Sequence, residues 1–561
     1  MRRLASAATL LALAVLPASA HAAVTITDAK IQPSTTAAGA HPNLTIDLSF
    51  GQSPATDDLK DLTVVLPQGL VGNPKAADRC SQASFQADAC PAGSKVGTTT
   101  VTAVPTILAV EGPPQDSPGD VYNLAPLGAE PARLGVVVRP TFPGASKIFL
   151  QSAVTISAAT DYGLRTTFTD IPRVSGQFDS VAIRVTRQVL TLNGTAAHGP
   201  FITNPTSCLP AEMTVTATSW DDAANPDDAT ASFTPTACEA LPYSPSLSGS
   251  IGGAGNTAKG AHPEFATTIE TRPGDANTER ATVALPSTVT PNIAHPMCKP
   301  DELAANVCPS ASRVGAARAE SPTLDAPLTG PVWFVNPGGG AFPQLAVQLS
   351  GPVAITLTGF AVPLDGKLAT SFANQPDLPL ERFDLKIDGG ENGLLTNNVD
   401  LCAPGADSTI LAEFVAHSGA ERETGTQLVR RGCQPAPPTA SYRLRPGATG
   451  HRILSGRFTA GVRAPKLTKV RVTLPPKLSP GAPNPKRRIT AFADGKKLGP
   501  LAIRVRDKGR RLGLILKGAR TVTFTWRGLV PRRGLAAHPR VTTEITDARG
   551  KVTLLSPPAA R

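Results

Sequence analysis

The eight cysteines are the residues whose types and spacing most directly imply chemistry, and they fall into two matching sets of four. The stretch CSQASFQADACPAGSKVG, from Cys80 to Gly97, recurs as CKPDELAANVCPSASRVG, from Cys298 to Gly315. Each stretch, which we call a cassette, has two cysteines separated by nine residues, then Pro, a small-residue turn, Ser, a basic residue, Val and Gly. A second, wider pair follows each cassette, as Cys208 with Cys238 and as Cys402 with Cys433.

Pairing of neighbouring cysteines is the simplest connectivity, although spacing alone does not fix it. Closing the shorter loop restricts the unfolded chain by roughly 3 kcal/mol, and closing the wider loop by about 4 kcal/mol. A zinc site would favour closely spaced pairs such as CxxC, and no His lies inside either cassette. We therefore expect structural disulfides and a short helix in each cassette, at Ser81–Ala87 and Asp301–Ala305. The expected bridges are Cys80–Cys90, Cys208–Cys238, Cys298–Cys308 and Cys402–Cys433.

Two histidines and two aromatic residues also recur at matching places. His41 and His262 each stand in a Gly-Ala-His-Pro motif, but no acidic residue or further His repeats beside them. We interpret them as turn residues that lead into a first strand. Tyr122 and Trp333 share a position after the cassettes, where a side chain could stack on a ligand. We expect them to fill the core instead.

The acidic residues offer two candidates for a site. The loop from Trp220 to Asp228 could supply oxygen ligands to calcium, but its spacing is not that of an EF-hand and the second repeat has no counterpart. We interpret it as a solvated turn. Asp179 and Asp384 each follow a Phe, and a glycosidase needs two carboxylates. We expect both to end strands.

No sequence motif of a known catalytic centre occurs in the chain. A GxSxG elbow, HExxH, GxxxxGK[ST] and a GxGxxG that opens a helix are all missing. We therefore expect no catalytic residue, no metal and no cofactor, and favour a non-enzymatic binding or structural protein of the cell envelope or the extracellular space. The alternative left open is a secreted hydrolase that acts on polysaccharide or ester substrates.

Charge is distributed very unevenly along the chain. From Ser441 to Arg561 there are 28 Lys and Arg against 4 Asp and Glu, a net charge of +24, whereas the preceding residues carry −13. Such a surface attracts polyanions in a salt-dependent way. We expect an anionic wall polymer or lipid surface as the partner, and no nucleic acid. The residues predicted to bind it are Lys486, Arg487, Arg488, Arg504, Arg506, Arg510 and Arg511.

The elements that must position these residues are short strands. Runs of Val, Thr, Ile and Leu are separated by 55 Pro and 49 Gly, which predicts an all-β chain of tandem antiparallel sandwiches with few short helices. LTVVLPQGL, from Leu62, recurs as ATVALPSTV, from Ala281, and as VRVTLPPKL, from Val470. We take this last strand as the opening of a C-terminal, immunoglobulin-like sandwich. The uncharged stretch Leu345–Leu364 predicts two strands with a turn at 350–352, and no transmembrane segment.

These features divide the chain into four parts. Residues 1–22 have the positive, apolar and small-residue order of a secretory signal, with cleavage after Ala20 or Ala22. Residues 23–240 and 241–434 form the first and second β-rich repeats, and residues 441–561 form the basic sandwich. We expect a secreted protein that is extracellular or loosely associated with the cell wall.

The repeated motifs also carry a resemblance. GAHP, LPQGL, the Cys-x9-Cys-Pro cassette and GDVYNL together resemble a set of uncharacterised secreted repeat proteins from actinobacteria. The resemblance covers residues 24–433 and implies export and duplication, but it brings no activity and no site residues. The basic unit is similar only in a general way to immunoglobulin-like domains.

Overall fold

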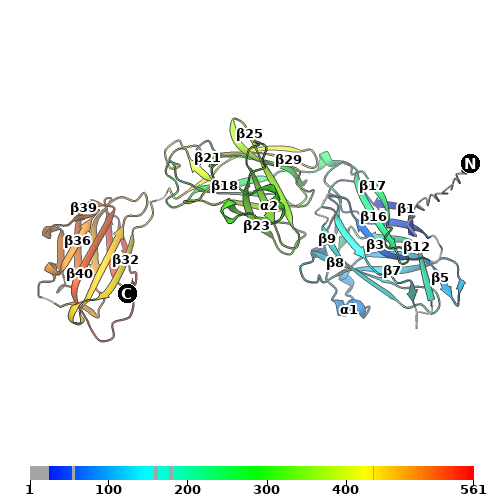
Figure 1. Ribbon diagram of the computed structural model, residues 1–561, viewed down its shortest axis with the longest axis horizontal. Coiled ribbons are helices and arrows are strands. Elements are labelled where there is room, and N and C mark those ends of the chain that lie inside the picture. Colours follow the sequence, from blue (N-terminus) through cyan, green and yellow to red (C-terminus); the bar gives the residue numbers. More distant parts are fainter. Residues whose placement is uncertain are drawn as a thin grey trace, which may run out of the picture.

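Three β-rich lobes follow one another in a row in the computed structural model (Figure 1). The structure describes residues 24–52, 57–156, 162–175, 181–433, 435–481 and 483–560. We refer to residues 24–240 as lobe 1, 241–433 as lobe 2 and 435–560 as lobe 3. The secretory signal predicted at residues 1–22 lies outside the described residues. The predicted all-β class is confirmed, and the α-helices of the described residues are α1 (Gln82–Gln86) and α2 (Pro300–Ala304), one in each cassette.

Lobes 1 and 2 contain the same sheet. In lobe 1 the hydrogen-bonded order is β1-β2-β12-β5-β7-β8-β9-β10-β3-β16-β17, and in lobe 2 it is β18-β19-β27-β22-β23-β24-β25-β26-β20-β29-β30. Each strand in this order therefore has a counterpart at the same place in the other lobe, as a duplication predicts. In lobe 1 the strands of this order are β1 (Val24–Pro33), β2 (Leu44–Gln52), β3 (Leu59–Val65), β5 (Lys95–Ile107), β7 (Gln115–Leu124), β8 (Ala132–Val138), β9 (Ile148–Ile156), β10 (Leu164–Phe168), β12 (Val181–Leu192), β16 (Ala211–Ser219) and β17 (Asp227–Phe233).

Lobe 2 also shows how such a sheet folds back on itself. Its last strand, β31 (Val429–Arg431), directly follows β30 and pairs in parallel with β18, so that the two ends of the sheet meet. In lobe 1 the backbone N–H of Ile26 on β1 donates to Asp227 on β17 at 2.7 Å. The other strands of this sheet are β18 (Ser246–Gly252), β19 (Glu264–Glu270), β20 (Thr278–Ala284), β22 (Arg313–Glu320), β23 (Leu328–Val335), β24 (Gln344–Leu349), β25 (Ile355–Leu364), β26 (Lys367–Phe372), β27 (Arg382–Ile387), β29 (Thr409–Ala416) and β30 (Glu421–Gln427).

Alternation of side chains places the core inside each curled sheet. On β2 the buried residues are Leu44, Ile46, Leu48 and Phe50, every second residue, because successive side chains of a strand point to opposite faces. The predicted turn in 345–364 is present between β24 and β25. Among the described residues, none of the helices has the length and apolar composition needed to span a membrane.

The eight cysteines form four disulfides, each within one lobe: Cys80–Cys90, Cys208–Cys238, Cys298–Cys308 and Cys402–Cys433. The cassettes lie on the outer face of their sheets. The N–H of Cys80 donates to Asn123 at 2.9 Å, and the N–H of Cys298 donates to Phe334 at 2.8 Å, so each cassette is bonded to the same strand of its lobe.

The repeated Pro, Ser, Val and Gly of the cassette each have a packing reason. The buried hydroxyls of Ser94 and Ser312 donate to the carbonyls of Pro91 and Pro309 at 2.6 and 2.7 Å, which closes the turn. The Val that follows is buried in the core in both lobes. The glycine, Gly315 in lobe 2, lies where the pairing of β22 with β23 shifts register, and on its other side it pairs with Ile387 of β27. A Cβ there would lie 1.9 Å from the carbonyl oxygen of Lys386.

This contact predicts a strong effect of Gly315→Ala. Since the clash is with backbone, strands β22 and β27 must separate, and we expect lobe 2 to lose about 2 kcal/mol or more of its free energy of unfolding. Gly513→Ala in lobe 3, where the nearest atom would lie 3.7 Å away, is the matched control and should change stability by less than about 0.5 kcal/mol. Chemical denaturation compares the two; equal effects would show that the close approach is not the cause.

Lobe 3 is a sandwich of two sheets. One has the order β37-β36-β40-β33-β32-β43, with β35 on β40, and the other is β38-β39-β34-β41-β42. The buried Trp526 lies in the core between them, with Phe458, Phe524, Val470 and Leu514. The strands are β32 (Thr439–Pro446), β33 (Arg452–Thr459), β34 (Leu467–Thr473), β35 (Leu478–Pro480), β36 (Ile489–Ala493), β37 (Lys496–Lys497), β38 (Ile503–Arg506), β39 (Arg511–Ala519), β40 (Thr521–Pro531), β41 (Thr542–Asp547), β42 (Val552–Leu555) and β43 (Ala559–Ala560).

One prediction for this lobe is wrong. The strand in VRVTLPPKL does not open the sandwich, because β32 and β33 precede it and bury Tyr442, Leu444, Leu454 and Phe458. It is β34, the middle strand of the second sheet. The first strand of lobe 3 accordingly begins at Thr439, two residues before the predicted boundary at 441.

A buried carboxylate joins lobes 1 and 2. Asp377 of lobe 2 is 2% exposed and accepts from the N–H and the hydroxyl of Thr206 at 2.8 and 2.6 Å, and from the N–H of Ser207 at 3.2 Å. Asn277 of its own lobe donates a further bond at 2.7 Å. Gly69, with φ +82°, lies against the same carboxylate, since a Cβ there would be 2.4 Å from it. The joint is therefore closely packed.

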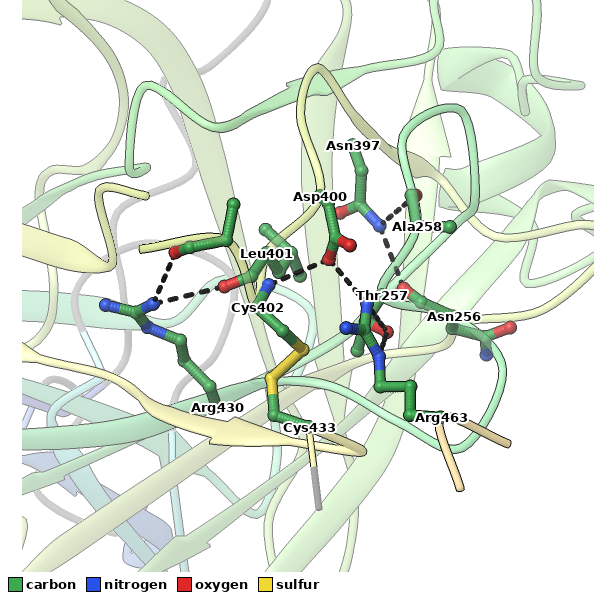
Figure 2. A network of polar contacts seen from close by, with 11 residues as sticks. Asn256, Thr257, Ala258, Asn397, Asp400, Leu401, Cys402, Arg430, Cys433 and Arg463 are labelled. Atoms are coloured by element: carbon green, nitrogen blue, oxygen red, sulfur yellow. Dashed lines mark hydrogen bonds and ion pairs between the residues drawn. A yellow bond between two sulfur atoms is a disulfide. The ribbon is translucent and has the colours of Figure 1, made fainter. Parts of the chain in front are cut away.

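A matching position joins lobes 2 and 3 (Figure 2). Asp400 precedes Cys402 by two residues, as Thr206 precedes Cys208. It forms an ion pair with Arg463 of lobe 3 at 2.5 Å, and Arg463 also donates to the Thr257 hydroxyl at 3.0 Å. The N–H of Cys402 and then this guanidinium lower the pKa of Asp400 below its ordinary value. Both joints thus use the segment beside the wider disulfide.

Candidate anion-binding surface

The outer face of the β38-β39-β34-β41-β42 sheet of lobe 3 carries a group of cations. On β38, Arg504 and Arg506 are exposed and alternate with the inward-facing Ile503 and Val505. Arg506 pairs across the strands with Arg511 of β39, so both side chains leave the same face. We call this surface the basic face; it consists of Arg504, Arg506, Arg511, Lys469, Arg471 and Lys517.

Three members of the basic face were not among the predicted binding residues. Lys469 and Arg471 lie on β34, and Lys517 lies on β39. The signal that would have found two of them is the alternation Lys469-Val470-Arg471-Val472, which places the valines in the core and the cations outside. Gly513 separates Arg504 from Arg471 across the sheet, so no side chain covers the centre of the face.

The other predicted cluster lies beside this face. Lys486, Arg487 and Arg488 are exposed in the 3-10 turn η7 (Pro485–Arg488), which contacts β38. The turn between β38 and β39 packs against it, because a Cβ on Gly509 would lie 3.2 Å from Pro485. The two predicted clusters are therefore adjacent in space.

Arg510 has a different role from the one predicted. It is half-buried, its side chain donates to the carbonyl of Leu474 at 3.4 Å, and its carbonyl accepts from the Leu474 N–H at 3.0 Å. It fixes the turn before β39, and its guanidinium does not belong to the exposed set. Adjacency in the sequence did not distinguish it from Arg511.

Few of these positive charges are neutralised. Among the described residues of lobe 3, only Arg463 and Arg471 take part in ion pairs, Arg463 with Asp400 of lobe 2 and Arg471 with Glu544 at 2.6 Å. Asp494 and Asp547 instead accept bonds from backbone N–H groups. The field of the basic face is therefore available to a partner, and salt will screen it.

The repeated histidines are part of the fold. His41 Nδ1 lies 3.2 Å from the carbonyl of Ile202 and 3.1 Å from the hydroxyl of Thr203. His262 contacts Leu395 and Thr396 in the same way, at 2.8 and 3.2 Å. Each ring holds the segment before its first inner strand against a short strand, β15 (Ile202–Thr203) or β28 (Leu395–Asn397). This agrees with their interpretation as turn residues.

The acidic candidates are engaged within their own lobe. Asp384 does not end a strand as predicted, because it is the third residue of β27; Asp179 lies outside the described residues. Arg382 donates to Asp384 at 2.8 and 2.9 Å and lowers the pKa of that carboxyl. Strand register makes Arg187 of lobe 1 the counterpart of Arg382, and Arg187 binds Asp47. An acid held ionised in this way is unsuited to protonate a leaving group.

The acids of the loop near Trp220 are also bonded to neighbouring groups. Asp222 accepts from the Asn225 amide at 2.8 Å, Asp227 from the Ile26 N–H at 2.7 Å, and Asp228 from the Thr216 hydroxyl at 2.5 Å. Within the described part of the chain, no group of three or more His, Cys, Asp or Glu side chains is placed to hold a metal ion.

Tyr122 and Trp333 do not fill the main cores. Both are half-buried and pack on the outer face of the sheet against the cassette, Tyr122 near Cys80 and Phe85, Trp333 near Cys298. The indole N–H of Trp333 donates to the Gln348 side chain at 2.7 Å. Their repeated position is explained by support of the cassette.

Comparisons with known proteins give only weak likenesses. No family model and no curated protein matches the chain. Among solved structures, the N-terminal domain of the Streptococcus gordonii adhesin Sgo0707 is 7% identical with a TM-score of 0.18, covering 89% of this chain and 95% of its own. The collagen adhesin of S. aureus is 8% identical over 56% and 92%, with a TM-score of 0.17. The collagen-binding domain of Erysipelothrix rhusiopathiae surface protein RspB is 12% identical over 55% and 90%, with a TM-score of 0.16. These scores carry no argument about the function of this chain.

Proposed function

We propose that this protein is an exported, non-enzymatic binding protein of the cell envelope, in which lobe 3 holds the molecule on anionic wall polymers. Four disulfides support export, because such bridges persist in oxidising compartments. The observation that carries the proposal is the basic face, where most cations lack an acidic partner among the described residues. We also propose, as part of the same assignment, that the two long repeats are related to the secreted actinobacterial repeat proteins that they resemble.

The shape of the site favours an extended polymer. The cations lie on three neighbouring strands and continue onto η7, so they form a series of separate charges instead of converging on one point. A series of this kind matches the repeated charges of a polyanion, and each contact adds a salt-dependent contribution. An anionic lipid surface is the competing partner, and it can be tested in parallel.

Binding to immobilised polyphosphate, measured by the salt concentration needed for elution, tests the proposal. The variant with Arg504, Arg506, Arg511, Lys486, Arg487 and Arg488 changed to Ser should elute at much lower salt than the unmodified protein. A matched control removes the same number of charges elsewhere in lobe 3, at Arg443, Arg445, Arg457, Arg527, Arg532 and Arg533. The control should retain most of the binding, because its charges lie outside the basic face.

Two outcomes would count against the proposal. If both variants lose binding equally, net charge alone explains retention, and the basic face is not a site. If the unmodified protein binds anionic vesicles but not the polymer, the partner is a lipid surface, and the wall-polymer assignment fails.

A further inference from the structure

An apolar cavity runs through the interiors of both long repeats. Its volume is about 330 Å³, and its walls come from lobe 1 and lobe 2 together. Strands β8, β9, β10 and β3 line it in lobe 1, and their counterparts β24, β25, β26 and β20 line it in lobe 2. The two hollows join where the lobes meet, since Ile156 at the end of β9 packs against the core of lobe 2.

The lining side chains point inward but remain incompletely covered. On β25 the lining residues are Ile355, Leu357, Gly359 and Ala361, every second residue, and only Gly359 is fully buried. Protein interiors are normally close-packed, with few voids larger than a water molecule. An apolar cavity of about 150 Å³ already stays dry and binds benzene. A single cavity of roughly twice that size, which extends through both copies of the repeat, is therefore more than a packing defect.

The apolar lining of the cavity indicates which class of ligand it can bind. Most lining residues are apolar, a minority are uncharged polar residues such as Asn123, Gln188 and Gln375, and Arg165 is the only charged one. An alkyl chain needs no hydrogen bonds and gains from every apolar contact, and a hollow continuous through two lobes suits a long, thin chain.

One charged side chain interrupts the largely apolar wall. Arg165 on β10 is exposed and forms no ion pair with any described residue, so the cavity reaches solvent there. The neighbouring Thr166 points to the opposite face of β10, and its buried hydroxyl finds no hydrogen-bond partner in the described structure. An exposed guanidinium without an acidic partner favours a carboxylate or phosphate group.

We propose that lobes 1 and 2 together bind an anionic lipid, with its alkyl chain in the cavity and its head group at Arg165. This site is separate from the basic face of lobe 3, so the variants that test that face should bind lipid normally.

Displacement of cis-parinaric acid, a fluorescent fatty acid, from the purified full-length protein tests this site. Unlabelled palmitate and lysophosphatidylglycerol should each compete if the site accepts any anionic head group; competition by one alone identifies that head group. Ala361→Phe in lobe 2 and Ala132→Phe in lobe 1 narrow the cavity and should weaken binding about tenfold or more. Thr356→Phe adds the same ring on the outer face of β25 and should leave binding unchanged.

Arg165→Gln distinguishes the contribution of the head-group contact from that of the alkyl chain. It should weaken palmitate binding about tenfold while leaving the uncharged hexadecanol unaffected. Circular dichroism and intact disulfides are used to confirm that each variant is folded. Because the two cavity variants lie in different lobes, one of them still tests the cavity if the other does not fold. Absence of parinarate binding by the unmodified protein, or equal binding by Ala361→Phe, Ala132→Phe and Thr356→Phe, would overturn the proposal.

Discussion

Replacing Cys208 and Cys238 by Ala lowers the free energy of unfolding of lobe 1 by about 3 to 4 kcal/mol, because the bridge closes a loop of 30 residues in the unfolded chain. The effect should also reach the joint with lobe 2. Cys208 directly follows the Thr206 and Ser207 that bind Asp377.

Amide hydrogen exchange measures this effect lobe by lobe. The slowest amides of lobe 1 should exchange about 10²- to 10³-fold faster in C208A/C238A, while those of lobe 3 stay unchanged. The equivalent variant of lobe 2, C402A/C433A, is the matched control. In this variant the largest increase in amide exchange rate should appear in lobe 2. An unaltered lobe 1 in C208A/C238A would show that the bridge does not stabilise its own lobe.

Asp377→Ala should weaken the coupling between lobes 1 and 2, so that the two lobes move more independently. The substitution leaves four donor groups without their acceptor: two on Thr206, one on Ser207 and one on Asn277. Because these groups are buried or nearly so, we expect the coupling of the two lobes to fall by about 3 kcal/mol. Each lobe keeps its own core and disulfides, so both should remain folded.

Small-angle scattering and exchange of the Thr206 and Ser207 amides report this change. The radius of gyration should rise and both amides should lose protection. Asp325→Ala is the control, since Asp325 forms an exposed ion pair with Arg79 across the same joint at 2.6 Å, and exposed pairs contribute less than about 1 kcal/mol. If Asp325→Ala loosens the joint as much as Asp377→Ala, burial of Asp377 is not what holds it.

Much of the architecture could be predicted because the duplication repeats local signals. The residues between the paired cysteines predicted the short helix of each cassette, and the alternation of apolar and polar residues on strands such as β34 predicted which faces are buried. Strand order could not be predicted, because pairings such as β12 with β2 join segments more than 130 residues apart. Asp377 likewise lies in a loop without any repeated motif, and its partner Thr206 is 171 residues away.

The candidate sites show the same division. Composition and spacing predicted the charge of lobe 3 and seven binding residues; six of these residues are exposed, and their binding of an anion stays a prediction. Arg510 is half-buried and Asp384 lies inside a strand, because a backbone carbonyl and a neighbouring arginine engage them only in the folded chain. The cavity could not be predicted at all. An inward-facing Leu357 is identical in sequence whether it meets another side chain or an empty hollow.

Fractionation of the native host tests the central claim most directly. We predict that the unmodified protein remains with the wall pellet and is released by a salt wash. The variant with six changes to Ser, three on the basic face and three on η7, should appear in the culture fluid, while the control that loses the same number of charges elsewhere in lobe 3 stays on the wall. Identical distribution of all three proteins would contradict retention by the basic face.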